Sequence, residues 1–319
     1  MKLKILIAES NYSSKALAIY KKLGSIYFLE NLSSKEKNKI FPQINILVVR
    51  LGLTVSGELM AKMSNLKIIA TSTTGLNHID TKYAKAKGVK IISLRGQKSF
   101  LKNIPSTAEL TFGLIISLLR NIPAAFDDVK LGGWNSSSWS GHQLLGKSVG
   151  LLGFGRLGKI MARYAKAFNM KVMACDPNVS EKFMKSRGVV KINMDGLFKR
   201  SDIVSLHVLL TDQTQNLIKE KHLRSMKPSA YLINTARAEL IEKNVLYNAL
   251  KNKRIAGAGI DVMWDERSDG SHLKKDQLWK YTKTHQNLII APHIGGATYE
   301  AMAVTQDFIA ESVFNFLKK

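Results

Sequence analysis

The sequence predicts an α/β fold with two doubly wound parallel-sheet domains. Short apolar runs alternate with segments of helical periodicity along nearly the whole chain, an alternation typical of parallel sheets covered by helices. The apolar runs fall into two series, separated by a helical stretch near residues 100–128. With 319 residues the chain is long enough for two domains.

The first series predicts four strands, at residues 4–8, 45–49, 67–71 and 90–94. The segment that follows, from Ser106 to residue 128, has helical periodicity. Ser106 is the expected N-cap, and Glu109 stands three residues later, which is the spacing of a capping box. We therefore expect one long helix here, running between the two domains.

The second series predicts six strands, at residues 148–153, 171–175, 202–207, 230–234, 256–262 and 287–291. Six strands with helical crossovers are the size of a full dinucleotide-binding domain. The final segment, residues 296–319, has the pattern of a C-terminal helix.

The composition is that of an ordinary soluble globular protein, with 45% hydrophobic and 23% charged residues. Cys175 is the single cysteine, which excludes an intramolecular disulfide and fits a reducing compartment. No apolar run reaches the roughly 18 residues of a membrane span, and the apolar N-terminus favours a first strand over a signal peptide. We expect a cytoplasmic protein with no membrane partner.

The net charge of +24 admits three interpretations: nucleic-acid binding, steering of an anionic substrate or cofactor, or a solvated surface rich in lysine. The lysines are spread along the whole chain, and no basic helix or RNA-binding aromatic motif accompanies them. This distribution favours the solvated surface, so no nucleic-acid partner is expected.

A glycine motif follows the strand predicted at 148–153. Gly153, Gly155 and Gly158 form GxGxxG between that strand and an amphipathic helix. In this context Gly153 permits a tight turn, Gly155 lets the backbone approach a pyrophosphate, and Gly158 allows close strand–helix packing. Free N–H groups at the helix N-terminus, around Arg156 and Leu157, would face the phosphates.

An acidic residue stands at the end of the next predicted strand. Asp176 lies 18 residues after Gly158 and can accept hydrogen bonds from the adenosine ribose hydroxyls. A carboxylate here repels a 2′-phosphate, and no arginine follows in Asp176-Pro177-Asn178. The expected cofactor is therefore NAD rather than NADP.

Polar residues follow three later predicted strands. They are Arg237 in NTAR, Asp261 and Glu266 in GIDVMWDE, and His293 in APHIGG. In a doubly wound sheet all three segments emerge at the carboxyl edge, beside the cofactor crevice. A cation, carboxylates and an imidazole are thus expected to converge near the nicotinamide.

The chain resembles the D-isomer-specific 2-hydroxyacid dehydrogenases that use NAD, and within them the phosphoglycerate dehydrogenase-like branch. The resemblance extends over essentially the full chain. It rests on GLLGFGRLGK, CDP, SLHVLLTDQT, MKPSAYLINTAR, GAGIDV and APHIGGAT, with STTGLNHID in the first half. It implies a Rossmann NAD-binding domain, residues 103–293, inserted in a flavodoxin-like substrate domain, residues 1–102 and 294–319.

The resemblance also implies roles for three residues. Arg237 would anchor the substrate carboxylate and polarise the 2-keto oxygen, because a planar bidentate donor suits a carboxylate. His293 would be the acid/base at that oxygen. Glu266 would hydrogen-bond the other ring nitrogen of His293 and orient it.

Further contacts are implied for cofactor and substrate. Besides the glycine motif and Asp176, the implied cofactor contacts are His207, Val208, Thr235, Ala236, Asp261, Gly295 and Gly296. The implied substrate contacts are Arg50, Thr74, Gly75 and Asn103. A homodimer through the helix at 107–128 is implied as well. No His, Cys or carboxylate cluster has metal-ligand spacing, so no metal is expected.

The sequence departs from the family pattern at Ala238, where glycine is usual, and at Leu209 and Arg267, where proline is common. These departures leave the substrate open. Arg50 lies where the phosphoglycerate branch places a basic residue, so 3-phosphoglycerate is preferred over glyoxylate or hydroxypyruvate. An NAD-sensing interaction protein without turnover is the alternative from another class.

Overall fold

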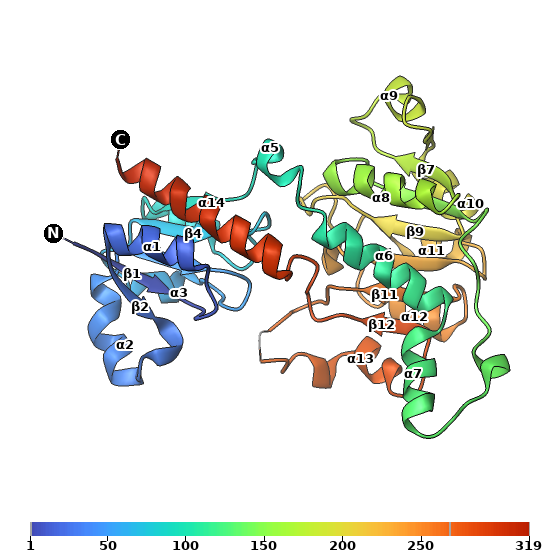
Figure 1. The fold of residues 1–319 in the computed structure, drawn as a ribbon, viewed down its shortest axis with the longest axis horizontal. Helices are drawn as coiled ribbons and strands as arrows, with labels where there is room; N and C mark the ends of the chain where they lie inside the picture. The colour runs from blue at the N-terminus through green and yellow to red at the C-terminus, as the bar shows by residue number, and fades with distance from the viewer. Residues whose placement is uncertain (1, 268, 319) are drawn as a thin grey trace. The chain divides into compact units, whose positions relative to one another are not determined.

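The computed structural model describes residues 2–267 and 269–318, and it divides into two compact units (Figure 1). Met1–Ile104, Arg267–Asp269 and Thr298–Lys319 form the five-stranded unit, and Pro105–Glu266 and Gly270–Ala297 form the seven-stranded unit. Each unit has a parallel sheet with helices. The predicted fold class, with two parallel-sheet α/β domains, is confirmed.

The five-stranded unit has the strand order β2-β1-β3-β4-β5. Its strands are β1 (Leu3–Ile7), β2 (Gly24–Phe28), β3 (Ile46–Val49), β4 (Ile68–Thr71) and β5 (Lys90–Ser93). The sequence did not predict β2. This strand lies at the edge of the sheet and none of its residues is fully buried, so its segment, GSIYF, lacks the continuous apolar run of a central strand.

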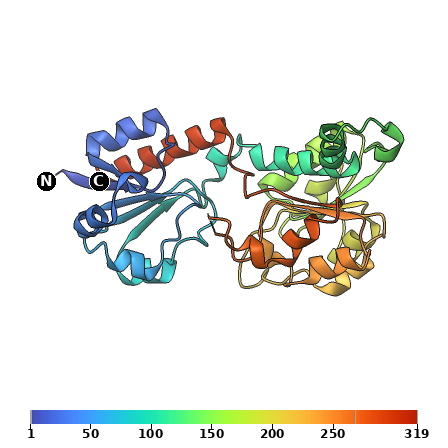
Figure 2. The same cartoon turned by 90° about the horizontal axis from the view of Figure 1, so that it is seen from below.

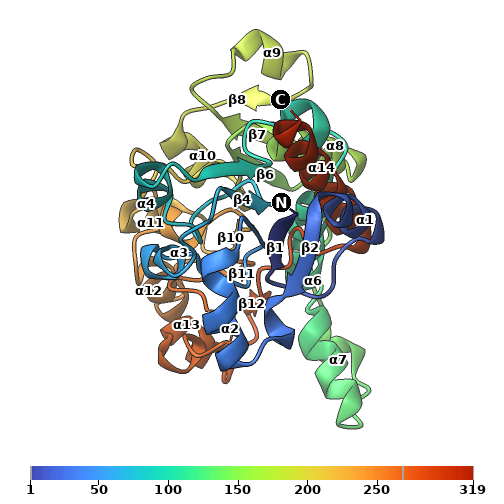
Figure 3. The ribbon, with the colours of Figure 1, turned by 90° about the vertical axis from the view of Figure 1, so that its left-hand side faces the viewer.

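Helices cover both faces of this sheet. They are α1 (Ser14–Leu23), α2 (Ser34–Ile40), α3 (Gly57–Ala61), α4 (Thr81–Ala86), α5 (Lys98–Leu101) and α14 (Tyr299–Leu317). The C-terminal helix α14 lies beside α1 (Figure 3). Alternate residues of β1 enter opposite cores: Ile5 packs with Ile309 of α14, while Leu6 packs with Met60 of α3. The C-terminal helix therefore contributes to the core on one face of the first sheet.

The seven-stranded unit has the order β12-β11-β10-β9-β6-β7-β8. Its strands are β6 (Ser148–Leu152), β7 (Lys171–Cys175), β8 (Val190–Lys191), β9 (Ile203–Leu206), β10 (Tyr231–Asn234), β11 (Gly257–Ile260) and β12 (Leu288–Ile290). Six of them match the predicted series, and β8 is a two-residue addition at the edge. The order reverses next to β6, so the switch point of the sheet lies at the loop after β6.

Helices also lie on both faces of the seven-stranded sheet (Figure 2). They are α6 (Ser106–Leu119), α7 (Ile122–Lys130), α8 (Arg156–Ala167), α9 (Glu181–Lys185), α10 (Met194–Arg200), α11 (Glu220–Ser225), α12 (Val245–Lys251) and α13 (Gln277–Thr282). Gly259 of β11 lies against Leu114 and Leu118 of α6, where a Cβ would come within 3.3 Å of either side chain. Helix α6 is therefore a core helix of this unit.

The single long helix predicted around residues 107–128 is wrong. The segment forms two helices, α6 and α7, because Asn121 adopts the left-handed conformation, with φ of 53°, and Pro123 cannot continue the hydrogen-bond ladder. Pro105, not Ser106, occupies the N-cap, and no side chain caps the helix.

Within the described residues, no single helix has the length and apolar character needed to span a membrane. Residues 98–119 and 122–130 reach that standard only together, and they are bent by 63° at the break.

Candidate active site

The three glycines after β6 have the spatial surroundings that a phosphate cradle requires. Gly153 has φ of +96°, and a Cβ there would come within 2.7 Å of the His207 carbonyl oxygen. A Cβ on Gly158 would meet the Gly153 carbonyl oxygen at 2.3 Å, so this residue packs the helix against the loop. A Cβ on Gly155 would meet nothing within 4 Å. The backbone at Gly155 therefore faces open space, where a pyrophosphate can approach closely.

Helix α8 begins at Arg156, directly after Gly155, and its first residues are Arg156 and Leu157. No side chain caps this end of the helix. Because the first N–H groups of a helix lack intrahelical acceptors and lie at the positive end of its dipole, the end of α8 at Gly155 suits an anionic ligand.

Asp176 stands directly after β7, next to the cradle. Its carboxylate accepts hydrogen bonds from the Phe154 N–H at 2.8 Å and from the Asn178 N–H at 2.9 Å. These bonds hold Asp176 at the carboxyl end of β7, beside the glycine loop. The placement fits the ribose-binding carboxylate of a dinucleotide site.

His207 and Val208 follow β9 and form the wall opposite Gly153. The His207 N–H donates to the Leu152 carbonyl oxygen at 2.7 Å, and its Nε2 lies 2.9 Å from the Ser205 hydroxyl oxygen. Burial lowers the pKa of His207 to about 4, so its ring is neutral at physiological pH. Its Nδ1 is buried and has no hydrogen-bond partner among the described residues.

The turn that carries Arg237 is fixed from inside by Asn234, the last residue of β10. The Asn234 side chain accepts from the Ala236 N–H at 3.0 Å and donates to the Arg237 carbonyl oxygen at 2.9 Å. Thr235 is buried, and its hydroxyl lies 2.7 Å from that of Thr111 in α6. These hydrogen bonds attach the turn to β10 and α6. The role of Asn234 was not predicted, although an Asx residue at a strand end is its sequence signal.

Ala238, which stands where the family has glycine, is buried, with 1% of its surface exposed, and begins a short 3-10 helix (Ala238–Leu240). The fold therefore accommodates the methyl group of Ala238 next to Arg237.

His293 and Glu266 are directly bonded. His293 Nδ1 lies 2.5 Å from Glu266 Oε2, and the other oxygen of Glu266 accepts from the Met263 N–H at 2.6 Å. Burial alone would raise the pKa of Glu266, but the hydrogen bond and charge of His293, the Met263 N–H and the charge of Arg237 lower it. Glu266 is therefore an anion, and Arg237, Glu266 and His293 belong to one electrostatic cluster at the ends of β10, β11 and β12.

Asp261 supports the loop that carries His293. It is buried at the end of β11, and its two carboxylate oxygens accept from the Ile294 N–H at 2.7 Å and the Gly295 N–H at 2.8 Å. Burial raises its pKa to about 6. A Cβ on Gly295 would meet this carboxylate at 2.9 Å, so glycine is needed there for the close contact. Gly296 is exposed in the same loop.

The residues implied for substrate binding lie in the five-stranded unit. Arg50 directly follows β3, and its Nη1 lies 3.5 Å from Glu9 Oε2. Thr74 and Gly75 are in the loop after β4, where the Thr73 hydroxyl donates to the Gly75 carbonyl oxygen at 2.8 Å. Asn103 is exposed after α5. Glu9, the partner of Arg50, was not among the predicted site residues.

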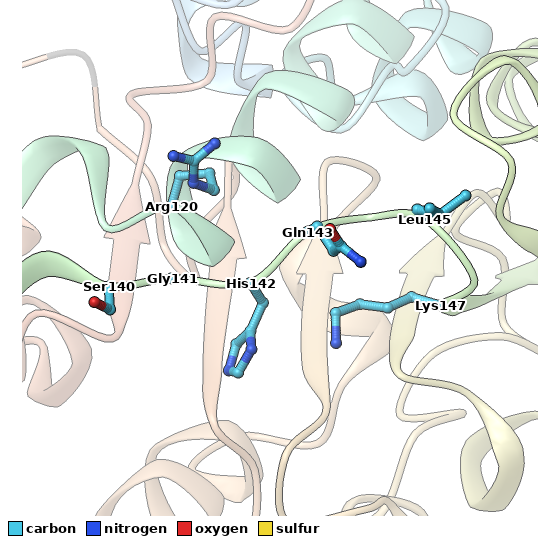
Figure 4. A pocket seen from close by; sticks show the side chains of 7 residues that line it. All are labelled: Arg120, Ser140, Gly141, His142, Gln143, Leu145 and Lys147. Carbon is cyan, nitrogen blue, oxygen red and sulfur yellow. The ribbon is translucent and has the colours of Figure 1, made fainter.

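A cavity of about 660 Å³ in the seven-stranded unit is separate from the residues described above (Figure 4). It is lined by Arg120, Ser140, Gly141, His142, Gln143, Leu145 and Lys147. Lys147 directly precedes β6, so this cavity lies at the amino edge of the sheet, while the cradle lies at the carboxyl edge. As for metals, residues 2–267 and 269–318 contain no group of three or more His, Cys, Asp or Glu side chains that could hold an ion.

The chain is similar to known proteins along most of its length. Residues 112–295 match the NAD-binding domain of the D-isomer specific 2-hydroxyacid dehydrogenases. The chain is 35% identical to a hydroxypyruvate reductase from Thermotoga maritima over 288 residues, which cover 90% of each chain. It is 32% identical over 316 residues to a D-3-phosphoglycerate dehydrogenase from Methanocaldococcus jannaschii, of whose length it spans 57%.

The fold is likewise that of a solved relative. The crystal structure of a D-lactate dehydrogenase from Aquifex aeolicus, complexed with NAD and lactic acid, has a TM-score of 0.82 and 29% identity, covering 99% of this chain and 95% of the relative. With its glycine cradle, its Asp176 and its Arg237, Glu266 and His293 cluster, the chain belongs to the D-isomer specific 2-hydroxyacid dehydrogenases, the NAD-dependent enzymes that move a hydride to or from C2 of a 2-hydroxyacid.

Proposed function

We propose that Arg237, Glu266 and His293 are the catalytic residues of this enzyme. The supporting observation is the bond between Glu266 and His293 Nδ1. Because an anionic carboxylate accepts from Nδ1–H, it fixes the ring orientation and leaves Nε2 to exchange a proton with the substrate oxygen. Bound NAD supplies the hydride chemistry. Arg237 holds the substrate carboxylate with its guanidinium, and its turn is immobilised by Asn234.

The two units divide this work. The seven-stranded unit, Pro105–Glu266 and Gly270–Ala297, binds NAD through the loop after β6. The five-stranded unit contributes substrate contacts from the loops after β3 and β4, including Arg50, Thr74 and Gly75. Carboxyl-edge loops are where open parallel sheets bind ligands, which supports this assignment.

We propose an unphosphorylated short 2-ketoacid, hydroxypyruvate or glyoxylate, as the substrate in preference to 3-phosphohydroxypyruvate. Arg50, the residue on which the phosphoglycerate interpretation rests, has a carboxylate beside its guanidinium. A neutralised arginine attracts a phosphate less than a free one does. The chain is also 35% identical to the hydroxypyruvate reductase, compared with 32% to the phosphoglycerate dehydrogenase.

We further propose a cytoplasmic homodimer formed through α7 rather than α6. Helix α6 is largely buried, whereas α7 and the loop after it expose large apolar side chains, namely Ile122, Phe126, Val129, Leu131 and Trp134. An exposed apolar patch of this kind marks an interaction surface. We expect sedimentation to give a dimer, and Phe126→Glu to give a monomer. A monomeric wild-type protein at micromolar concentration would contradict the proposal.

The test of the proposed function is NADH oxidation with pyruvate, glyoxylate, hydroxypyruvate, 2-ketoglutarate and phosphohydroxypyruvate. We expect hydroxypyruvate or glyoxylate to give the highest kcat/KM. NADH binding without turnover of any 2-ketoacid would instead favour an NAD-sensing interaction protein. The variant Arg237→Ala is the control, since it should abolish turnover while NADH still binds.

A further inference from the structure

The switch point of the five-stranded sheet holds an ion pair that no catalytic role requires. In the order β2-β1-β3-β4-β5, the loops after β1 and β3 leave the sheet in different directions, and ligands bind in the crevice between such loops. Glu9 is in the loop after β1, and Arg50 directly follows β3. The two strands are neighbours, with Ile7 paired to Val48, so both side chains lie at the carboxyl edge.

The position of the Glu9 carboxylate is defined by two contacts. Its Oε2 lies 3.5 Å from Arg50 Nη1, and its Oε1 lies over the loop after β3, where a Cβ on Gly52 would come within 3.1 Å of it. Both side chains are partly exposed, Arg50 by 23% and Glu9 by 30%. The pair is therefore open to a ligand, and a pair so exposed contributes little to folding stability.

The other ionisable groups around this pair do not replace Glu9. The charges of Arg50 and Glu9 both act on Tyr12, but burial is the main effect and raises the pKa of Tyr12, so its phenol is neutral at physiological pH. Asp307 of α14 accepts a hydrogen bond from the Ser13 hydroxyl at 2.5 Å. Glu9 is thus the carboxylate that offsets the Arg50 charge in this crevice.

We propose that Glu9 is a specificity-determining residue, which cancels the charge of Arg50 and so selects substrates with an uncharged tail over phosphorylated ones. This proposal rests on the proposed function. A phosphate monoester has a charge between about −1.5 and −2 at pH 7. A carboxylate placed ~7 Å away, across the guanidinium, repels it enough to change binding roughly tenfold in a half-exposed site.

The experiment compares hydroxypyruvate with phosphohydroxypyruvate, which share the 2-ketoacid head and differ only in the phosphate. In Glu9→Gln, which keeps the shape and removes the charge, the ratio of kcat/KM for phosphohydroxypyruvate to that for hydroxypyruvate should rise roughly tenfold. In Glu9→Gln/Arg50→Ala most of this rise should disappear, because the freed guanidinium is the group that attracts the phosphate. Glu58→Gln, at an exposed carboxylate of the same unit, should leave the ratio unchanged.

An unchanged ratio in Glu9→Gln would overturn the proposal, and so would an equal rise in Glu58→Gln, which would indicate a general charge effect. If the wild-type protein turns over no 2-ketoacid, the proposed function fails, but the role of Glu9 is still decided by binding. The measurement is then calorimetric titration of 3-phosphoglycerate and D-glycerate into NAD-saturated protein. Glu9→Gln must lower the Kd for 3-phosphoglycerate roughly tenfold relative to the Kd for D-glycerate, and the absence of that change refutes the proposal.

Discussion

Replacement by alanine should have different effects at Gly155 and at Gly158, which lies three residues later. Gly155 is the N-cap of α8 with open space around its Cβ position, and Gly158 lies in the first turn of α8, where a Cβ would be 2.3 Å from the Gly153 carbonyl oxygen. The first substitution should therefore reduce NAD binding at little cost in stability. The second should reduce the stability of the seven-stranded unit.

The magnitudes follow from these surroundings. Gly155→Ala replaces one N-cap by a poorer one and should cost about 0.5 kcal/mol of unfolding free energy. Its methyl group occupies the space of the pyrophosphate, so the Kd for NADH should rise at least about tenfold, or ~1.4 kcal/mol. Gly158→Ala forces backbone apart, at about 3 kcal/mol, and recovers about 1 kcal/mol of helix propensity. The net loss of stability is about 2 kcal/mol.

The assay is urea unfolding without cofactor, monitored by tryptophan fluorescence. Chains of two domains unfold in more than one step, but the four tryptophans of this protein, Trp134, Trp139, Trp264 and Trp279, all belong to the seven-stranded unit. Their signal therefore reports on that unit alone. A separate titration with NADH gives the Kd. Equal stability losses in the two variants, or normal NADH affinity in Gly155→Ala, would refute this account of the cradle.

Three further changes test the site. Arg237→Lys should lower kcat/KM with hydroxypyruvate by about 100-fold and leave the Kd for NADH unchanged, because a lysine cannot bind the carboxylate with two parallel hydrogen bonds; near-normal turnover in steady-state kinetics would exclude Arg237 as the anchor. Asp176→Ala should weaken NAD binding and reduce the preference for NAD over NADP by at least about tenfold. An unchanged cofactor preference would contradict the contact between Asp176 and the ribose. Asp261 has a pKa raised by burial to about 6, from 3.8, so the cost of burying its charge is absent at low pH and appears as the pH rises through 6. Relative to Asp261→Asn, which does not titrate, the wild-type protein should gain about 2–3 kcal/mol of unfolding free energy as the pH is lowered from 7 to 4. If urea titrations give the same difference in unfolding free energy between the two proteins across that range, the pKa of the carboxylate is not raised.

Strong local patterns explain what could be predicted. The buried strands of both sheets are continuous apolar runs, because parallel strands covered on both faces need apolar side chains on both. The glycine cradle could also be predicted, since glycine is the residue that tolerates the φ of +96° at Gly153 and the close packing at Gly158. Arg237, Glu266 and His293 follow separate strands, and strand ends in a parallel sheet share one edge.

Other features depend on contacts between distant segments. The edge strand β2 has no apolar run of its own and is fixed by pairing with β1. The break between α6 and α7 depends on one residue, Asn121, whose left-handed backbone ends a helix that the apolar periodicity would have continued. The Asn234 hydrogen bonds that hold the Arg237 turn were also not evident from the sequence, because the sequence does not show which backbone groups a strand-end asparagine will contact.

The sequence by itself therefore determined the fold class and the cofactor, since each rests on local motifs with specific backbone requirements. It also predicted which residues face the cofactor. Tertiary structure alone decided the charge environment of those residues. Glu9 and Arg50 are 41 residues apart, and only the neighbouring positions of β1 and β3 bring the carboxylate onto the guanidinium. Electrostatic energy depends on the distance between charges in space, so the residue that we propose sets substrate preference became visible only in the folded chain.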